Sequence, residues 1–217
     1  MNHAKLNGVY YTPSEITSFC CSHYLKYYHN RNSKKIKILE PSCGNGEFLI
    51  DIVKYKELKD IKIIIDLVDI DKSELKLAQK RVLKNRNNKI KSEAINTDFL
   101  FFETDNKYDL ITGNPPYIGK RHLSKEQIEQ AKAIQKENGN SREIKNIWTA
   151  FIYKQLSLLK KSGTLCQVLP IELLHVDHTK HLRDLLLAFF DRIEIFTFKE
   201  IVFENTLQDV VILFASN

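Results

Sequence analysis

The sequence has little glycine, proline or cysteine and no long apolar segment. Its 217 residues include seven glycines, five prolines and four cysteines. No apolar run reaches the ~20 residues that a membrane-spanning helix needs. The N-terminal MNHAKLNGVYYTPSE lacks the apolar stretch that a secretory signal contains. We therefore expect a cytoplasmic protein with no membrane segment.

The cysteines and histidines form no recognisable metal motif. Cys20, Cys21, Cys43 and Cys166 lack paired CxxC spacing, which disfavours both a zinc site and a disulfide framework. The histidines at 175, 178 and 181 follow one another in three-residue steps, so the first and the last diverge around a helix. We predict that the chain holds no metal.

The charge balance permits an anionic partner. Lys and Arg number 33 against 27 Asp and Glu, which gives a net charge of +6. A basic surplus is typical of proteins that bind nucleic acid, although a solvated, lysine-rich surface explains it equally well. The hydrophobic share of 43% excludes a wholly disordered chain.

Because glycine and proline are scarce, their positions are informative. Pro41, Pro115 and Pro170 each follow an apolar run that predicts a strand. Four glycines gather after the first two of these runs, at 44, 46, 113 and 119. In an open α/β sheet, ligands bind beyond the carboxyl ends of the strands. The pattern therefore predicts a ligand site at that edge.

The hydrophobic pattern predicts one α/β domain over residues 1–217. We predict strands at 36–40, 61–70, 91–96, 108–112, 164–169, 192–198 and 209–214, and a turn at 160–163. We predict helices at 14–28, 47–56, 72–87, 147–159 and 177–190, and a polar helical segment over 118–146. This alternation indicates a doubly wound, mostly parallel seven-stranded sheet. The short connection between the last two strands favours an antiparallel last strand.

Capping residues predict where three of the helices begin. Thr12 with Glu15 and Ser124 with Gln127 have the spacing of a capping box, and Asp71 with Glu74 has it too.

Acidic residues follow three successive predicted strands. Glu40 opens the loop EPSCGNGEF at 40–48, Asp69 ends the second strand, and Asp98 follows the third. A carboxylate at Asp69 suits ribose hydroxyls, and Asp98-Phe99 suits the amine and the face of an adenine ring. Leu49 stands where a dinucleotide motif has its third glycine, and Glu40 repels a pyrophosphate. The loop therefore favours a cationic ligand that bears an amino group or a sulfonium.

Asn114-Pro115-Pro116-Tyr117 follows the fourth predicted strand. An aromatic amine such as adenine N6 is a poor nucleophile because its lone pair is delocalised into the ring. The Asn114 side-chain carbonyl and the Pro115 main-chain carbonyl can accept hydrogen bonds from such an amine, while the prolines contribute no competing N–H donors. The ring of Tyr117 offers a flat face on which a base can stack.

Together these motifs resemble the S-adenosylmethionine-dependent adenine-N6 DNA methyltransferases of the gamma class. The resemblance implies a Rossmann-like methyltransferase fold and a catalytic role for Asn114, Pro115, Pro116 and Tyr117. It implies contacts between S-adenosyl-L-methionine and Thr12, Glu40, Pro41, Cys43, Gly44, Gly46, Asp69, Ile70, Asp98, Phe99 and Asn114. It also implies that Tyr117 and Phe203 contact the substrate base, and that the helix start at 146–151 packs beside the cofactor.

The resemblance implies methyl transfer to a flipped adenine in double-stranded DNA, as part of a restriction-modification system. A methyltransferase for a protein glutamine or an RNA base amine, or a non-catalytic subunit, remains an alternative. Members usually carry a target-recognition domain after the last strand, whereas this sequence ends at Asn217. Three alternatives follow: the recognition part has been removed, a separate specificity domain or subunit supplies it, or recognition is weak. The polar insertion 118–147, with seven Lys or Arg against four acids, is a lid or a DNA contact.

Overall fold

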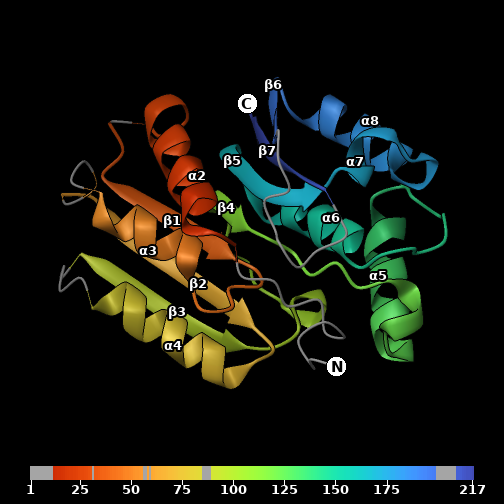
Figure 1. The fold of residues 1–217 in the computed structure, drawn as a ribbon, viewed down its shortest axis with the longest axis horizontal. Helices are drawn as coiled ribbons and strands as arrows, with labels where there is room; N and C mark the ends of the chain where they lie inside the picture. Colours follow the sequence, from red (N-terminus) through yellow and green to blue (C-terminus); the bar gives the residue numbers. More distant parts are fainter. Residues whose placement is uncertain (1–11, 31, 56–57, 59, 85–88, 199–208) are drawn as a thin grey trace.

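The protein is a three-layer α/β domain in the computed structural model, which describes residues 12–30, 32–55, 58, 60–84, 89–198 and 209–217. Seven strands form one sheet in the order β3-β2-β1-β4-β5-β7-β6 (Figure 1). The strands are β1 (Lys35–Glu40), β2 (Lys62–Asp69), β3 (Ile90–Asn96), β4 (Tyr108–Gly113), β5 (Leu159–Pro170), β6 (Arg192–Thr197) and β7 (Val210–Ser216).

The predicted sheet is confirmed, including its one antiparallel strand. The ladders among β1 to β5 are parallel, and β7 pairs antiparallel with both β5 and β6. The carboxyl ends of β1 to β5 therefore meet along one edge of the sheet. This is the edge at which an open α/β sheet binds ligands.

Helices cover both faces of the sheet (Figure 1). The longer helices are α2 (Ser14–Tyr27), α3 (Glu47–Lys54), α4 (Lys72–Leu83), α5 (Lys125–Glu137), α6 (Trp148–Leu158) and α8 (Lys180–Phe189). Apolar side chains of α2, α3 and α4 share one hydrophobic cluster with the sheet, and those of α5, α6 and α8 share the other. Strand β2 is buried on both faces, as its sequence KIIIDLVD predicts.

The short elements lie at the ends of strands and helices. They are η2 (Phe99–Phe101), η3 (Lys120–His122), α7 (Glu172–His175) and η4 (Asp177–Thr179). No helix within the described ranges is long and apolar enough to cross a membrane. The same residues contain no group of three or more His, Cys, Asp or Glu side chains arranged to hold a metal ion.

Three local predictions are wrong. The residue at the N-cap of α2 is Pro13, with no side-chain cap, because the Thr12 hydroxyl accepts a hydrogen bond from Asn114 instead. The expected turn at 160–163 is a bulge inside β5, at a register shift against β4. The helix predicted over 177–190 begins as η4 and becomes α8 only at Lys180.

The two other predicted caps are confirmed. Asp71 accepts hydrogen bonds from the main-chain N–H groups of Ser73 and Glu74 at the start of α4. Ser124 and Gln127 form a complete capping box on α5. The insertion 118–147 is packed, because Ala131, Ile134 and Ile144 within it are buried against the rest of the domain.

Candidate active site

A cavity of about 270 Å³ lies at the carboxyl edge of the sheet. Glu40 ends β1, Asp69 ends β2 and Asn114 follows β4, and all three line it. Its lining comprises Thr12, Glu40, Pro41, Ser42, Cys43, Gly44, Asn45, Glu47, Phe48, Asp69, Ile70, Asp71, Glu74, Thr97, Asp98, Phe99, Asn114, Pro115, Pro116, Ile118, Gln127, Ile147 and Phe151. Most of the predicted site residues are thus brought together.

The loop between β1 and α3 is held in a tight conformation by main-chain hydrogen bonds. The N–H of Cys43 donates to the Val68 carbonyl (3.0 Å), and the N–H of Gly46 donates to the Cys43 carbonyl (2.7 Å). Gly44 and Gly46 have positive φ angles of 47° and 80°. Gly46 does not line the cavity. It caps α3 in a left-handed conformation that other residues rarely adopt.

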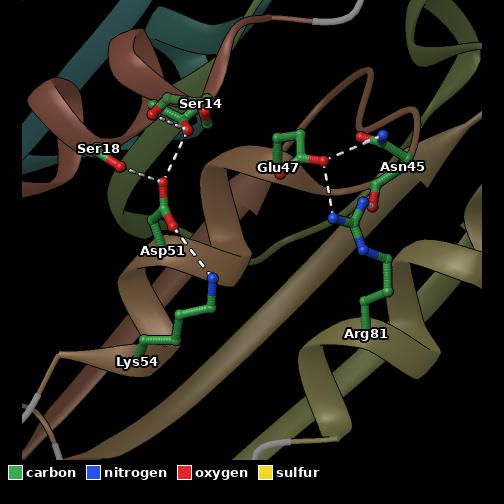
Figure 2. Close-up of polar contacts among 8 residues, drawn as sticks. Ser14, Ser18, Asn45, Glu47, Asp51, Lys54 and Arg81 are labelled. Atoms are coloured by element: carbon green, nitrogen blue, oxygen red, sulfur yellow. Dashed lines mark hydrogen bonds and ion pairs between the residues drawn. The ribbon is translucent and has the colours of Figure 1, made fainter.

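Arg81 on α4 anchors the same loop from below (Figure 2). Its Nη1 donates to the Asn45 carbonyl (2.9 Å), and its Nη2 donates to Glu47 Oε1 (2.7 Å). Asn45 Nδ2 donates to the same carboxylate oxygen (3.3 Å). The sequence pattern did not single out Arg81, because its partners lie more than thirty residues earlier in the chain.

Asp51 connects its own helix, α3, to α2, the helix that follows Thr12 (Figure 2). The Thr17 and Ser18 hydroxyls, both on α2, donate to Asp51 Oδ2 at 2.8 Å each. Lys54 Nζ lies 3.4 Å from Asp51 Oδ1. These contacts fix α2 against α3, and so they fix the position at which Thr12 enters the cavity wall.

Glu40 is a buried carboxyl group in the cavity wall. It is 1% exposed, and its Oε2 has no hydrogen-bond partner among the described residues. Burial raises the pKa of Glu40 well above its ordinary value, and the negative charges of Asp69 and Glu47 raise it further. A cation that binds beside such a carboxyl group stabilises its ionised form.

The electrostatic character of the cavity is strongly acidic. Six carboxylates line it, those of Glu40, Glu47, Asp69, Asp71, Glu74 and Asp98, and none of its described lining residues is Lys, Arg or His. Such a lining disfavours a pyrophosphate and favours a cationic ligand. This agrees with the expectation from the loop sequence.

Asp69 binds the loop as well as facing the cavity. Its Oδ2 accepts the N–H of Gly44 (2.7 Å), and its Oδ1 accepts the N–H of Asp71 (2.8 Å). Burial raises the pKa of Asp69, and these main-chain hydrogen bonds oppose the rise. Each carboxylate oxygen accepts more than one hydrogen bond, so Asp69 retains acceptor capacity for hydroxyl groups.

Asp98 and Phe99 form the wall next to Asp69. Asp98 Oδ1 accepts the N–H of Leu100 (2.9 Å), which caps η2. The Phe99 ring is 2% exposed and packs on Phe151 with ring centroids 5.0 Å apart. Ile70, in contrast, is 67% exposed, so its apolar side chain at the cavity is available to contact a ligand.

Asn114 has its two amide atoms in different environments. Nδ2 donates to Thr12 Oγ1 (3.2 Å), whereas Oδ1 is buried without a hydrogen-bond partner in the part of the chain that the structure describes. The Ser42 hydroxyl donates to the Asn114 main-chain carbonyl (3.1 Å). Thr12 holds the amide nitrogen and Ser42 holds the main chain, and the amide oxygen is left available as an acceptor.

Tyr117 is not among the residues that line the cavity. The Tyr117 hydroxyl donates to the Val168 carbonyl (3.0 Å), and the ring packs between the two hydrophobic clusters while staying partly exposed. Burial raises the pKa of this phenol well above its ordinary value. Phe203 lies outside the described residues. The roles of both with a substrate base stay predictions.

The cavity suits S-adenosylmethionine in its chemistry. The unpartnered carboxyl oxygen of Glu40 and the acidic lining fit a ligand with an ammonium and a sulfonium. The conformation of Gly44 lets the main chain approach a ligand closely. Ile147 and Phe151 of the predicted 146–151 helix start contribute apolar surface to the same cavity.

The sequence of the chain matches a family model over residues 8–203. That model describes the Eco57I restriction-modification methylase. The chain belongs to this family. The family match confirms the predicted relationship to restriction-modification methyltransferases, and the structural neighbours confirm the predicted fold.

Individual proteins that are similar to this Eco57I-family chain are also methyltransferases. A Type II methyltransferase, M.CvrRI of Paramecium bursaria Chlorella virus XZ-6E, is 31% identical over 77% of the chain and 37% of its own length. A class I S-adenosylmethionine-dependent methyltransferase structure from Listeria monocytogenes superposes with a TM-score of 0.74 at 20% identity, covering 94% of this chain and 60% of its own. The methyltransferase subunit of a type I restriction-modification system from Streptococcus thermophilus gives 0.74 at 16% identity, covering 97% and 45%.

The chain spans little more than a third of the length of the curated relatives that it matches. The two structural neighbours are under 25% identical, so they establish the fold alone.

Proposed function

We propose that this chain is the catalytic domain of an adenine-specific DNA methyltransferase in a restriction-modification system. In this proposal the methyl group of S-adenosylmethionine is transferred to adenine N6 in double-stranded DNA. The family description and the name of the viral relative, a Type II methyltransferase, support DNA as the substrate. The choice of adenine N6 depends on the geometry around Asn114.

The unpartnered amide oxygen of Asn114 is the observation that carries the proposal. Asn114 Oδ1 is an acceptor held in a cavity wall, and the nitrogen of the same amide already donates to Thr12. A primary amine on an aromatic ring is a donor that such an oxygen can accept. Accepting its N–H helps the lone pair of the amine to localise as the new bond forms, which is stabilisation of the transition state.

The two prolines complete the acceptor site in this proposal. Pro115 and Pro116 line the cavity and have no main-chain N–H, so neither contributes a main-chain donor that would compete with the amine for the acceptor oxygens. The Ser42 hydroxyl already occupies the Asn114 main-chain carbonyl. We assign the second acceptor to the Pro115 main-chain carbonyl.

The remaining cavity residues would hold the cofactor, which supplies an electrophilic methyl group on a cationic sulfur when it is bound. We assign its amino-acid end to Glu40 and the glycine loop, its ribose to Asp69, and its adenine to Asp98 and Phe99. The exposed face of Ile70 would cover the adenine ring. Thr12 would close the site from the N-terminal side.

The target base must leave the DNA duplex to reach this cavity. Flipping it out costs a few kcal/mol, which stacking on aromatic side chains offsets. We assign that stacking to Tyr117, whose ring is fixed by its hydrogen bond to Val168, and to Phe203. Sequence recognition is assigned to a separate domain or subunit, because the chain matches only part of its relatives.

The test is methylation of macromolecule pools with tritiated S-adenosylmethionine, followed by nucleoside analysis. Unmethylated DNA, RNA and total protein are incubated separately with the chain, and we expect label in N6-methyl-2′-deoxyadenosine. Label in N4-methylcytosine, in RNA or in glutamine would contradict the proposal.

Asn114→Ala is the matched variant in this experiment. We expect it to lower the rate of transfer by roughly 10²–10³-fold, because it removes one preorganised hydrogen-bonding group from the transition state. Its affinity for S-adenosylmethionine, measured by calorimetry, should stay within about threefold of the wild-type value. An unchanged transfer rate would remove Asn114 from its assigned role.

A further inference from the structure

The side chain of Gln127 joins the start of α5 to the cavity. Its Nε2 donates to Asp98 Oδ2 (2.7 Å), and its Oε1 accepts the main-chain N–H of Ser124 (3.0 Å). Gln127 also lines the cavity. From the sequence alone this residue was only the second half of a helix cap, yet its amide serves two partners at once.

The two oxygens of Asp98 are fixed from opposite sides. Oδ1 accepts the N–H of Leu100 (2.9 Å), within its own turn, and Oδ2 accepts the Gln127 amide from another element. The orientation of the carboxylate therefore depends on α5 as well as on η2. A carboxylate oxygen accepts two hydrogen bonds, so Oδ2 keeps one position for a ligand amine while Gln127 is bound.

The η2 turn that follows Asp98 is also bonded to side chains of α5 and α6. Gln130 Nε2, one helical turn after Gln127, donates to the Leu100 carbonyl (3.0 Å). Lys154 Nζ on α6 donates to the same carbonyl (2.8 Å) and lies 5.4 Å from the centroid of the Phe99 ring. Helices α5 and α6 thus support both the carboxylate and the ring that face the cavity.

We propose that Gln127 is a positioning residue for the cofactor, which orients Asp98 to accept the exocyclic amine of the cofactor's adenine. The inference rests on the placement of that adenine at Asp98, which is part of the proposed function. It adds a residue from the segment after Asn114-Pro115-Pro116-Tyr117 to the cofactor site. In consequence, discrimination for the 6-amino group depends on a helix that no cofactor motif includes.

The informative substitution is Gln127→Glu. Glutamate keeps the capping box, since its carboxylate still accepts the Ser124 N–H. It loses the N–H donor and places a second carboxylate against Asp98. Lys125→Gln is the control, because it makes the same change in net charge at an exposed position in the same helical turn.

The measurement is calorimetric binding of two ligands in the absence of DNA: S-adenosylhomocysteine, and its analogue in which hydrogen replaces the 6-amino group of the purine. We expect wild-type protein to bind the amino ligand more tightly. Gln127→Glu should weaken binding of the amino ligand about tenfold or more, because a hydrogen bond to a charged group is lost. Its affinity for the analogue should change less than threefold, and Lys125→Gln should match wild type with both.

The outcomes separate the inference from the proposed function. An equal loss with both ligands would reduce Gln127 to a structural role, and no loss with either would remove it from the site. If wild-type protein binds the two ligands equally, Asp98 does not accept the 6-amino group. Both the placement of the adenine and the inference about Gln127 are then wrong. Label in N4-methylcytosine, in RNA or in glutamine would overturn the proposed function and leave these binding results standing.

Discussion

At the scale of single residues, the site contains buried polar atoms that lack a hydrogen-bond partner within the described chain. Glu40 Oε2 and Asn114 Oδ1 are buried and have no partner within the described chain. Burying an unpaired polar group costs about 1–3 kcal/mol, and more when the group is charged. Both residues line the cavity, so the cost falls where a ligand can recover it.

Glu40→Gln should make the protein more stable and a poorer binder of cofactor. The folded-state pKa of Glu40 is raised above its ordinary value of 4.5. Its favourable contribution to folding is therefore complete below about pH 4.5 and is lost as pH rises through the raised value. At pH 8 we expect the variant to have a free energy of unfolding about 1–3 kcal/mol above wild type, with a smaller gap at pH 5.

Denaturant titrations at the two pH values measure this gap, and calorimetry measures the affinity for S-adenosylmethionine. We expect affinity at pH 8 to fall about tenfold or more, because a charge partner of the cation is lost. Glu129→Gln, at an exposed position on α5, is the control and should change neither quantity. A variant less stable than wild type at pH 8 would contradict the account of Glu40.

Residue-scale prediction from the sequence succeeded where the chemistry is local to a motif and failed where it is shared between distant segments. Asp71 and Ser124 were identified as caps because their partners lie within three residues. Thr12 was also interpreted as a cap, but its hydroxyl is bonded to Asn114, 102 residues away. For Gln127 the sequence predicted the cap but not the hydrogen bond to Asp98, which lies 29 residues earlier.

At the scale of elements, the strands and the loop after β1 were predictable because hydrophobic runs and glycines report directly on backbone geometry. All seven strands form near the predicted positions. The bulge at 160–163 was taken for a turn because its polar, glycine-containing sequence has the same local signal. Whether such a segment reverses the chain or stays in the ladder is decided by pairing with β4, which the local sequence does not encode.

Gly46→Ala should destabilise the β1–α3 loop. The φ angle of Gly46 is +80°, and an added Cβ would lie 2.9 Å from the Ala78 Cβ on α4. The backbone conformation alone costs a non-glycine residue about 1–3 kcal/mol. We expect a loss of at least that size in chemical denaturation, together with weaker cofactor binding.

Gly119→Ala is the matched control for this prediction. Its φ angle is −68°, and the nearest atom to an added Cβ is the Lys145 carbonyl oxygen at 3.9 Å. This variant should stay within about 0.5 kcal/mol of wild type. Equal losses at the two glycines would show that neither the φ angle nor the approach to α4 limits the loop.

At the scale of the whole molecule, charge is segregated. Six acidic side chains line the cavity, although the chain carries a net charge of +6. The basic surplus therefore lies outside the cavity, and the insertion 118–147 contains a surplus of three positive charges. An acidic pocket for a cationic cofactor beside a basic surface suits the proposed pairing of S-adenosylmethionine with a polyanionic substrate.

Exposed lysines of α5 should contribute to DNA affinity through phosphate contacts. Lys132 and Lys136 are exposed and lie four residues apart, on one side of the helix. If both contact phosphates, replacing both with Gln should lower the slope of log affinity against log salt by roughly 0.9 for each. Binding to duplexes of different sequence should weaken to a similar extent, because phosphate contacts carry no sequence information.

The control for this double variant uses the same spacing on the other side of the sheet. Lys76 and Lys80 are exposed on α4, whose apolar side chains belong to the opposite hydrophobic cluster (Figure 1). Replacing these two with Gln removes the same charge from the molecule but not from the insertion. Fluorescence anisotropy over a range of salt concentrations distinguishes the cases. Equal slopes for the two double variants would mean that net charge drives binding and that α5 is a solvated cover over the cofactor site.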